Sequence, residues 1–184
     1  MVDTQSGIKI ANWVFNNLKV LKNYPDSKSK GEKGRCFKIT NLQSEYTQEF
    51  IEKYSFPYKE LKHIQENLFN FFKIPPSPYS ATGVTLLYAP KGYKPHWSQD
   101  INLRDDEYTT HLKVMLNKPV KGGMPMLKKE NNEVTLPLNR FEPWLCVGGK
   151  EIYSTEKIQG ESPYISLSFS YRVKKGILES LRYI

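Results

Sequence analysis

Apolar residues recur at helical spacing in the first part of the chain. One face of the segment 7–22 carries Ile10, Trp13, Val14, Leu18 and Leu21. This spacing predicts an amphipathic helix, and the Gly-, Ser- and Pro-containing segment 23–35 predicts a loop after it. A second amphipathic helix is predicted from Ser55, which can cap it, to the proline-rich run at 74–78, where proline prevents continuation.

From residue 83 onward the pattern changes to short β-type runs separated by turn residues. The runs lie at 83–89, 110–117, 124–129, 133–138, 143–149, 151–155 and 164–173. A spacing of about 8–12 residues between turn signals is typical of an antiparallel sandwich or barrel. The sequence therefore predicts one α+β, mainly β domain over 1–184, with a helical flank at 7–78, a β core at 83–173 and a closing helix or tail at 174–184.

The charge of the chain is strongly positive, with a formal net charge of +8. Much of the excess lies in the segment 22–38, which is also rich in Ser and Gly. One interpretation is a contact with nucleic acid or another anionic partner; the other is a solvated loop of a lysine-rich protein. The absence of an RNP, helix-turn-helix or zinc-finger pattern favours the solvated loop.

Neither a membrane span nor a secretory signal is indicated. No window approaches about 20 continuous apolar residues, and the first residues lack a basic region followed by an apolar run. The two cysteines, Cys36 and Cys146, lie far apart and form no CxxC pair. They allow one disulfide, but we expect two buried thiols in a reducing compartment. These features predict a cytoplasmic protein without membrane contact.

Histidine is scarce, and its positions decide which chemistry the chain can support. The chain has three, of which His63 falls off the apolar stripe of the second predicted helix and is expected on the surface. His96 ends the run LLYAPKGYKPH, and His111 begins HLKVMLNKPVKGGMPML. No histidine occurs in the later runs PWLCVGGKEIYSTEK and PYISLSFSYRV.

The order of these runs and of their Gly and Pro turns resembles the 2-oxoglutarate/Fe(II) dioxygenase superfamily, in its prolyl-hydroxylase-like form, over about half the chain. The resemblance implies a double-stranded β-helix (jelly roll) with N-terminal buttressing helices. It also implies Fe(II), held by two imidazoles and one carboxylate, and 2-oxoglutarate, whose distal carboxylate pairs with a cationic side chain.

The resemblance places the expected metal ligands at positions where most of the required side chains are missing. His96 matches the first histidine, but the carboxylate position two residues later is Ser98. Asp100 is the nearest acid, and it would reach a metal only from a bulged strand. The second histidine position falls on Tyr153 or Ser154, with Tyr153 preferred.

The cosubstrate arginine is missing as well, because Pro163 and Tyr164 stand where it is expected. Lys113 would be a substitute, and His111 would approach a metal, if their face of the strand 110–117 lines the barrel. If that face meets solvent, both are ordinary surface residues. The opposite face carries Leu112, Val114 and Leu116, which resembles a core face and favours solvent for Lys113 and His111.

The leading hypothesis is therefore a degenerate dioxygenase-like protein that has lost the standard binding of Fe(II) and 2-oxoglutarate. It would act as a binding or regulatory pseudoenzyme toward a protein, peptide, small molecule or nucleic acid. Trp97, Ser98, Trp144 and Ser154, with Tyr153 and Tyr164, would fill or line its pocket.

Two alternatives stay open. One is an active non-haem iron hydroxylase with His96, Asp100 and either Tyr153 or His111 as ligands. The other is an unrelated jelly-roll binding domain that is similar in architecture only.

Overall fold

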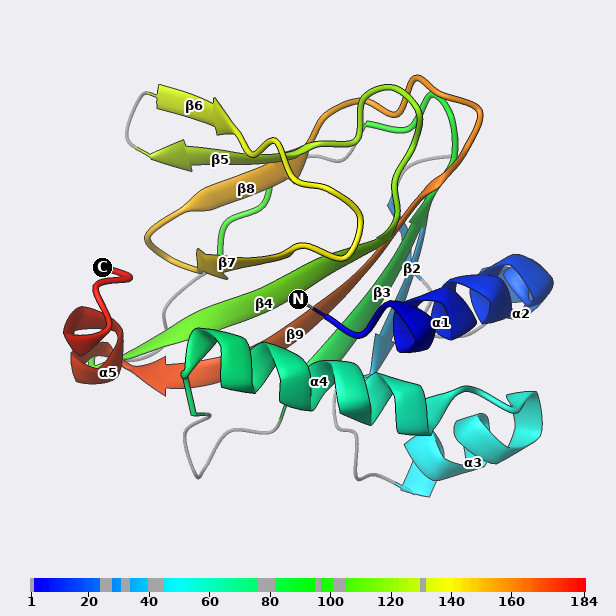
Figure 1. Ribbon diagram of the computed structural model, residues 1–184, viewed down its shortest axis with the longest axis horizontal. Helices are drawn as coiled ribbons and strands as arrows, with labels where there is room; N and C mark the ends of the chain where they lie inside the picture. The colour runs from blue at the N-terminus through cyan, green and yellow to red at the C-terminus, as the bar shows by residue number, and fades with distance from the viewer. Residues whose placement is uncertain are drawn as a thin grey trace.

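The part of the chain that the computed structural model describes consists of residues 2–23, 28–30, 34–39, 45–75, 82–94, 97–100, 105–129 and 132–184. In this part, helices cover one side of two antiparallel β-sheets that stack as a sandwich (Figure 1). The helices are α1 (Thr4–Asn16), α2 (Leu18–Asn23), α3 (Glu45–Tyr54), α4 (Tyr58–Phe72) and α5 (Lys175–Ser180). None of the described helices is long and apolar enough to cross a membrane.

The first predicted helix is two helices, because the chain breaks at Asn17. Asp3 caps α1 by accepting hydrogen bonds from the backbone N–H groups of Gln5 (3.3 Å) and Ser6 (3.0 Å). At the other end, the side-chain amide of Asn17 donates to the backbone carbonyl of Trp13 at 2.8 Å. This local bond satisfies a carbonyl that a continuous helix would have used, and so it favours an end there.

The predicted cap of the second helix was wrong. Ser55 lies in the turn between α3 and α4 with a positive φ of 48°, and Pro57 is the residue that precedes the first turn of α4. Proline suits this place because its fixed φ is compatible with helix entry and it needs no N–H partner there.

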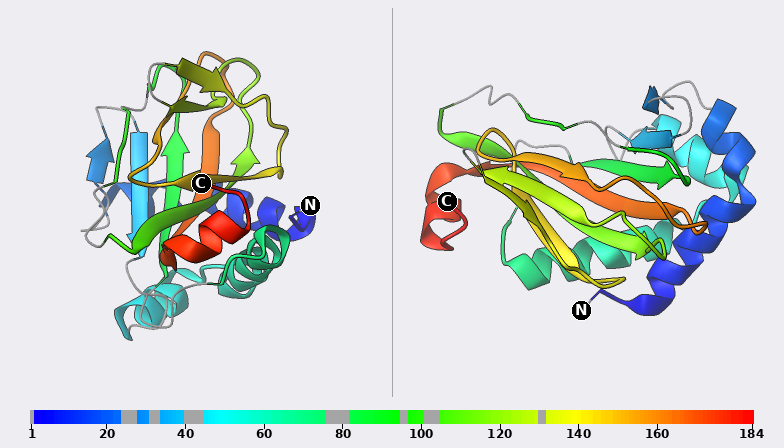
Figure 2. Two further views of the ribbon diagram at one scale, coloured as in Figure 1. Left: turned by 90° about the vertical axis from the view of Figure 1, so that its left-hand side faces the viewer. Right: turned by 90° about the horizontal axis from the view of Figure 1, so that it is seen from above.

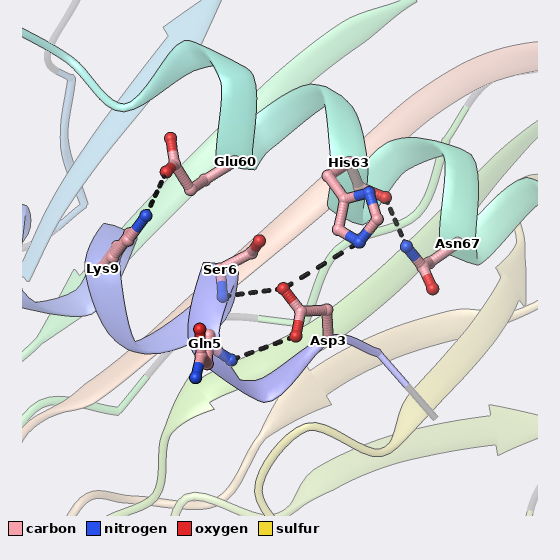
Figure 3. A network of polar contacts seen from close by, with 7 residues as sticks. All are labelled: Asp3, Gln5, Ser6, Lys9, Glu60, His63 and Asn67. Atoms are coloured by element: carbon pink, nitrogen blue, oxygen red, sulfur yellow. Dashed lines mark hydrogen bonds and ion pairs between the residues drawn. The ribbon is translucent and has the colours of Figure 1, made fainter.

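Side chains of α1 and α4 form polar contacts across the groove between the two helices (Figure 3). Lys9 on α1 donates to Glu60 on α4 at 2.7 Å. Near the start of α1, Nε2 of His63 lies 3.9 Å from Oδ2 of Asp3. The His63 side chain is 54% exposed, which confirms its predicted surface position. Contacts this exposed orient the helices but add little stability.

The larger sheet has the order β1-β2-β3-β9-β4-β7 and the smaller one the order β6-β5-β8. The strands of the larger sheet are β1 (Lys28–Lys30), β2 (Gly34–Ile39), β3 (Gly83–Ala89), β9 (Tyr164–Lys174), β4 (Glu107–Asn117) and β7 (Pro143–Val147). Those of the smaller sheet are β6 (Asn132–Thr135), β5 (Pro125–Lys129) and β8 (Ile152–Thr155). From β3 onward the chain passes repeatedly between the two sheets, as a jelly roll requires, so the predicted fold class is confirmed.

The segment 7–78, predicted as a helical flank, also supplies β1 and β2 to the edge of the larger sheet. The tail 174–184 contains α5. The organisation of 1–184 as a single domain stays a prediction.

The main hydrophobic core lies between the larger sheet and the helices α1 and α4, which Figures 1 and 2 show on one side of that sheet. The neighbouring strands β4 and β9 contribute Leu112, Val114, Leu116, Ile165, Leu167, Phe169, Tyr171 and Val173 to it. Their other face looks toward the smaller sheet, where two further apolar clusters form the interior of the barrel. Strands β4 and β9 are therefore covered on both faces.

Replacing Phe169 with alanine tests this core. Phe169 is fully buried between the sheet and the helices, so we expect Phe169→Ala to lower the free energy of unfolding by roughly 3–5 kcal/mol. Val120 is 88% exposed, so we expect Val120→Ala to stay within about 0.5 kcal/mol of the parent. Urea denaturation followed by circular dichroism measures both; equal effects would contradict the assignment of the core.

Candidate functional site

His111 and Lys113 lie on the face of β4 that looks into the barrel, so the preference for a solvent-facing position was wrong. His111 is only 6% exposed, and its ring centroid lies 5.3 Å from that of Tyr153 on the opposite sheet. The apolar face of β4 does belong to the core, as predicted. The error arose because β4 is buried on both faces, so one apolar face did not imply that the other meets solvent.

Both ring nitrogens of His111 are hydrogen-bonded. Nδ1 lies 2.7 Å from the hydroxyl of Ser170, and Nε2 lies 2.5 Å from Oδ2 of Asp100. Because a carboxylate only accepts, Nε2 donates its hydrogen to Asp100, and Nδ1 pairs with the hydroxyl of Ser170, which donates to Nδ1 when the ring is neutral and accepts from it when the ring is protonated. Neither nitrogen keeps a lone pair for another ligand.

The backbone explains why these three side chains meet. His111 and Ser170 are directly opposite in the pairing of β4 with β9, so they share the interior face. Asp100 reaches them from the segment before β4 by packing against Gly148. A Cβ atom at position 148 would lie 2.4 Å from Oδ2 of Asp100, so this approach needs a glycine.

Lys113 is held by aromatic rings from two other strands. Its ammonium nitrogen lies 3.5 Å from the ring centroid of Tyr153 on β8 and 4.8 Å from that of Trp144 on β7. Trp144 is directly opposite Lys113 in the pairing of β4 with β7. Attraction between a cation and a ring face strengthens when water is excluded, so these rings stabilise the charge inside the barrel. Asp100, His111, Lys113, Tyr153 and Ser170 together form what we call the interior polar cluster.

Ser98 and Tyr153 lie side by side in the barrel wall as an antiparallel backbone pair. The N–H of Ser98 donates to the carbonyl of Tyr153 at 2.8 Å, and the N–H of Tyr153 donates back at 2.9 Å. The residues that the resemblance places at the carboxylate and second histidine positions are therefore cross-strand neighbours. Trp97 is 37% exposed, whereas Ser154, which follows Tyr153 along β8, is buried.

His96 lies outside the described residues, as do the side chains of the basic segment 22–38. Tyr164 is 2% exposed and packs with Met115 and Ile158 in an apolar cluster. Burial raises the pKa of Tyr164, partly offset by hydrogen bonds to Ser166 and Thr155. Its hydroxyl is thus neutral at physiological pH, and it provides no positive charge to pair with the distal carboxylate of 2-oxoglutarate.

Cys146 lies beside the interior polar cluster as a free, buried thiol. Burial raises the pKa of Cys146 from its ordinary 9.0 to about 12; Lys113 acts in the opposite direction, and Glu151 and Asp100 raise it further. The thiol is therefore protonated, and it is neither a nucleophile nor a thiolate ligand at neutral pH.

The described side chains do not fit a ferrous site of the kind that the resemblance implies. Ser98 and Tyr153 offer neutral oxygens in place of a carboxylate and an imidazole, and both nitrogens of His111 are already bonded. Within the described ranges, no group of three or more His, Cys, Asp or Glu side chains is arranged to hold a metal ion.

Comparison with known proteins shows the fold. No protein-family model matches the sequence, and no curated protein matches it. A prolyl-4-hydroxylase from Pseudomonas putida superposes with a TM-score of 0.57 at 13% identity, over 94% of this chain and 88% of that one. The viral collagen prolyl hydroxylase of Paramecium Bursaria Chlorella virus-1 gives 0.54 at 12% identity, over 94% of each chain.

AviO1 from Streptomyces viridochromogenes Tue57 gives a TM-score of 0.58 at 9% identity, over 91% of this chain and 84% of that one. An oxidoreductase of the 2OG-Fe(II) oxygenase family from Burkholderia pseudomallei is also similar in structure. The chain thus has the fold of the 2-oxoglutarate/Fe(II) oxygenases, as its sequence predicted. At these identities the likeness extends to the fold alone.

The contact between Gly148 and Asp100 is testable by a double-mutant cycle. We expect Gly148→Ala to destabilise the chain by roughly 1–3 kcal/mol, because the new methyl group displaces the Asp100 carboxylate. In an Asp100→Gly background the same substitution should cost much less. Urea denaturation of the four proteins measures this coupling; additive effects would contradict the contact.

The thiol of Cys146 gives a pH-dependent prediction. The unfolded chain loses this proton near pH 9 and the folded chain near pH 12, so the stabilisation is complete below pH 9 and is lost as pH rises toward 12. In a Cys36→Ala background, the chain should therefore lose stability above pH 9, relative to Cys36→Ala/Cys146→Ala, by up to about 1.4 kcal/mol per pH unit. Chemical denaturation across this range measures the difference; a constant difference would contradict the buried thiol.

Proposed function

We propose that this chain is a binding protein that keeps the oxygenase fold and does not use iron and 2-oxoglutarate in the standard way. The observation that carries the proposal is the interior polar cluster. In this cluster His111 is bonded to Asp100 and to Ser170, and Lys113 lies against the ring of Tyr153, so these side chains interact with each other inside the barrel.

The charge of Lys113 supports this proposal on physical grounds. Its ammonium group lies against the ring of Tyr153, the residue at the expected second histidine position. A fixed positive charge beside a ligand position opposes the binding of a divalent cation, and more strongly in an interior of low dielectric constant. A tyrosine side chain in this position offers only a phenol oxygen in place of an imidazole nitrogen, which is a weaker ligand for a ferrous ion.

The hydrogen bonds of His111 support it as well. To serve as a metal ligand, the imidazole must give up its bond to either Asp100 or Ser170. A bond to a charged partner contributes about 1.5–3 kcal/mol, and breaking it leaves a partly buried carboxylate without that donor. Metal binding would first have to offset this loss.

An active non-haem iron oxygenase with altered ligands is the second candidate. The observation that favours it is that Asp100 and His111, both of ligand type, lie within 2.5 Å of each other beside Tyr153. This candidate requires His96 to join them, and it requires the pair to separate so that each side chain can turn a lone pair toward the metal.

Metal uptake separates the two candidates. Equilibrium dialysis against Mn(II) with 2-oxoglutarate, followed by elemental analysis, should leave the parent chain with far less than one metal ion per chain. The variant His96→Ala should be folded and give the same result. One metal ion per chain in the parent that is lost in His96→Ala would contradict the proposal and favour the altered oxygenase.

A gain-of-binding variant provides the matched control. Ser98→Asp with Tyr153→His restores a carboxylate and an imidazole at two positions that the backbone already holds opposite each other. We expect this double variant to take up more Mn(II) than the parent, and to lose the gain when His96→Ala is added. This result would show that the side chains, and not the backbone, limit metal binding.

A further inference from the structure

A groove lies at one end of the barrel, outside the interior polar cluster. The connections that follow β3, β4 and β8 gather there, at the upper right of Figure 1, away from α4. The groove has a volume of about 470 Å³, and its lining includes Lys94, Lys121, Gly122, Met126, Glu156 and Lys157. It shares no residue with the interior polar cluster.

Backbone hydrogen bonds fix the walls of this groove. Ile158, whose side chain is fully buried, exchanges hydrogen bonds with the connection after β3: its N–H donates to the carbonyl of Tyr93 at 2.9 Å, and its carbonyl accepts from Gly92 at 2.7 Å. The carbonyl of Lys121 accepts from Gln159 and Gly160, each at 3.0 Å. Three connections are thus joined before any ligand arrives, which lowers the entropy cost of binding.

Close packing at Gly122 holds two of these connections against each other. Its φ is +74°, and a Cβ atom there would lie 2.0 Å from the backbone carbonyl oxygen of Lys157. The groove therefore has a fixed distance between the Lys121 and Lys157 positions.

The groove is positively charged, and its cations are available. Lys94, Lys121 and Lys157 are exposed, and none of them forms an ion pair with any residue in the described ranges. The neighbouring Lys91, in contrast, is paired with Glu161. Glu156 is held by a bond from the N–H of Met124 at 3.3 Å. The net charge of +8 would also attract an anionic partner to the chain.

The chemistry of the lining favours a peptide over a nucleic acid. None of the described residues that line the groove is aromatic, so they offer bases no ring to stack on. Glu156 also lines the groove, and it would repel the uninterrupted row of phosphates of a nucleic acid more than a peptide whose carboxylates can be spaced around it. Met126 and the bare Gly122 offer an apolar floor, and Val120, next to Lys121, is 88% exposed. An apolar side chain flanked by carboxylates would match both features.

We infer that this groove is a docking site for an acidic peptide segment of a partner protein, in which carboxylates meet Lys94, Lys121 and Lys157 and an apolar side chain lies over Gly122 and Met126. The exposed amide of Gln159 provides a hydrogen-bonding group for the peptide backbone. This site goes beyond the proposed function, since it does not depend on the presence or absence of iron in the barrel.

Isothermal titration with an acetylated, amidated Glu-Glu-Leu-Glu-Glu peptide tests the inference at low salt. We expect saturable binding that weakens at least about tenfold in Lys121→Glu/Lys157→Glu, because two attractions become repulsions. The control Lys19→Glu/Lys59→Glu makes the same change in net charge on α2 and α4, and it should stay within about twofold of the parent. Thermal unfolding of each variant checks that the fold is kept.

Other outcomes overturn the inference. Absence of binding would show that no site exists. Equal weakening in both double variants would show that the peptide responds only to the net charge of the chain. Competition by a pentathymidylate oligonucleotide at the peptide's own concentration would assign the groove to nucleic acid. Equal competition by citrate would assign it to small anions. Loss of affinity when leucine is replaced by glycine in the peptide is expected, and an unchanged affinity would contradict the apolar floor.

Discussion

The long antiparallel pairing of β4 with β9 is the constraint on which the other parts of this structure depend. It runs from Glu107 opposite Lys174 to Asn117 opposite Ile165, inside the larger sheet, with β3 next to β9 and β7 next to β4. One face of the pair carries Leu112 and Phe169 to the helices, and the other carries polar side chains into the barrel. A shift of one residue would exchange these faces, so the register fixes the hydrophobic core and the interior polar cluster together.

The strands could be predicted because each run of β-type residues is bounded by turn residues, and these are local signals. The orientation of β4 could not, because a strand covered on both faces gives no simple alternation. The break at Asn17 was missed for a related reason: apolar spacing continues through Leu18 and Leu21, while the bond from Asn17 to Trp13 depends on one side-chain amide. Ser55 is of a residue type that often caps helices, but its positive φ places it in a turn.

The same holds for the candidate site: some of its contacts follow from local sequence signals, and others join residues far apart in the sequence. The resemblance aligned Ser98 and Tyr153 with two expected ligand positions, and the backbone does pair these two residues. His111 is bonded to Asp100, 11 positions away, and to Ser170, 59 positions away. No spacing in the sequence predicts these bonds. The only local signal was the glycine pair at 148–149, which predicts a turn but also leaves room for the Asp100 carboxylate.

The end of the barrel where three connections meet is held by main-chain atoms and small residues, not by the lysine side chains that surround it. Substitutions at 94, 121 and 157 therefore leave the shape of these connections unchanged, whereas substitutions at Gly122 do not. Selection can then alter the charge and selectivity of this surface by single steps without a loss of stability. A rigid backbone with independent side chains thus allows the charge of this surface to change without a change in its shape.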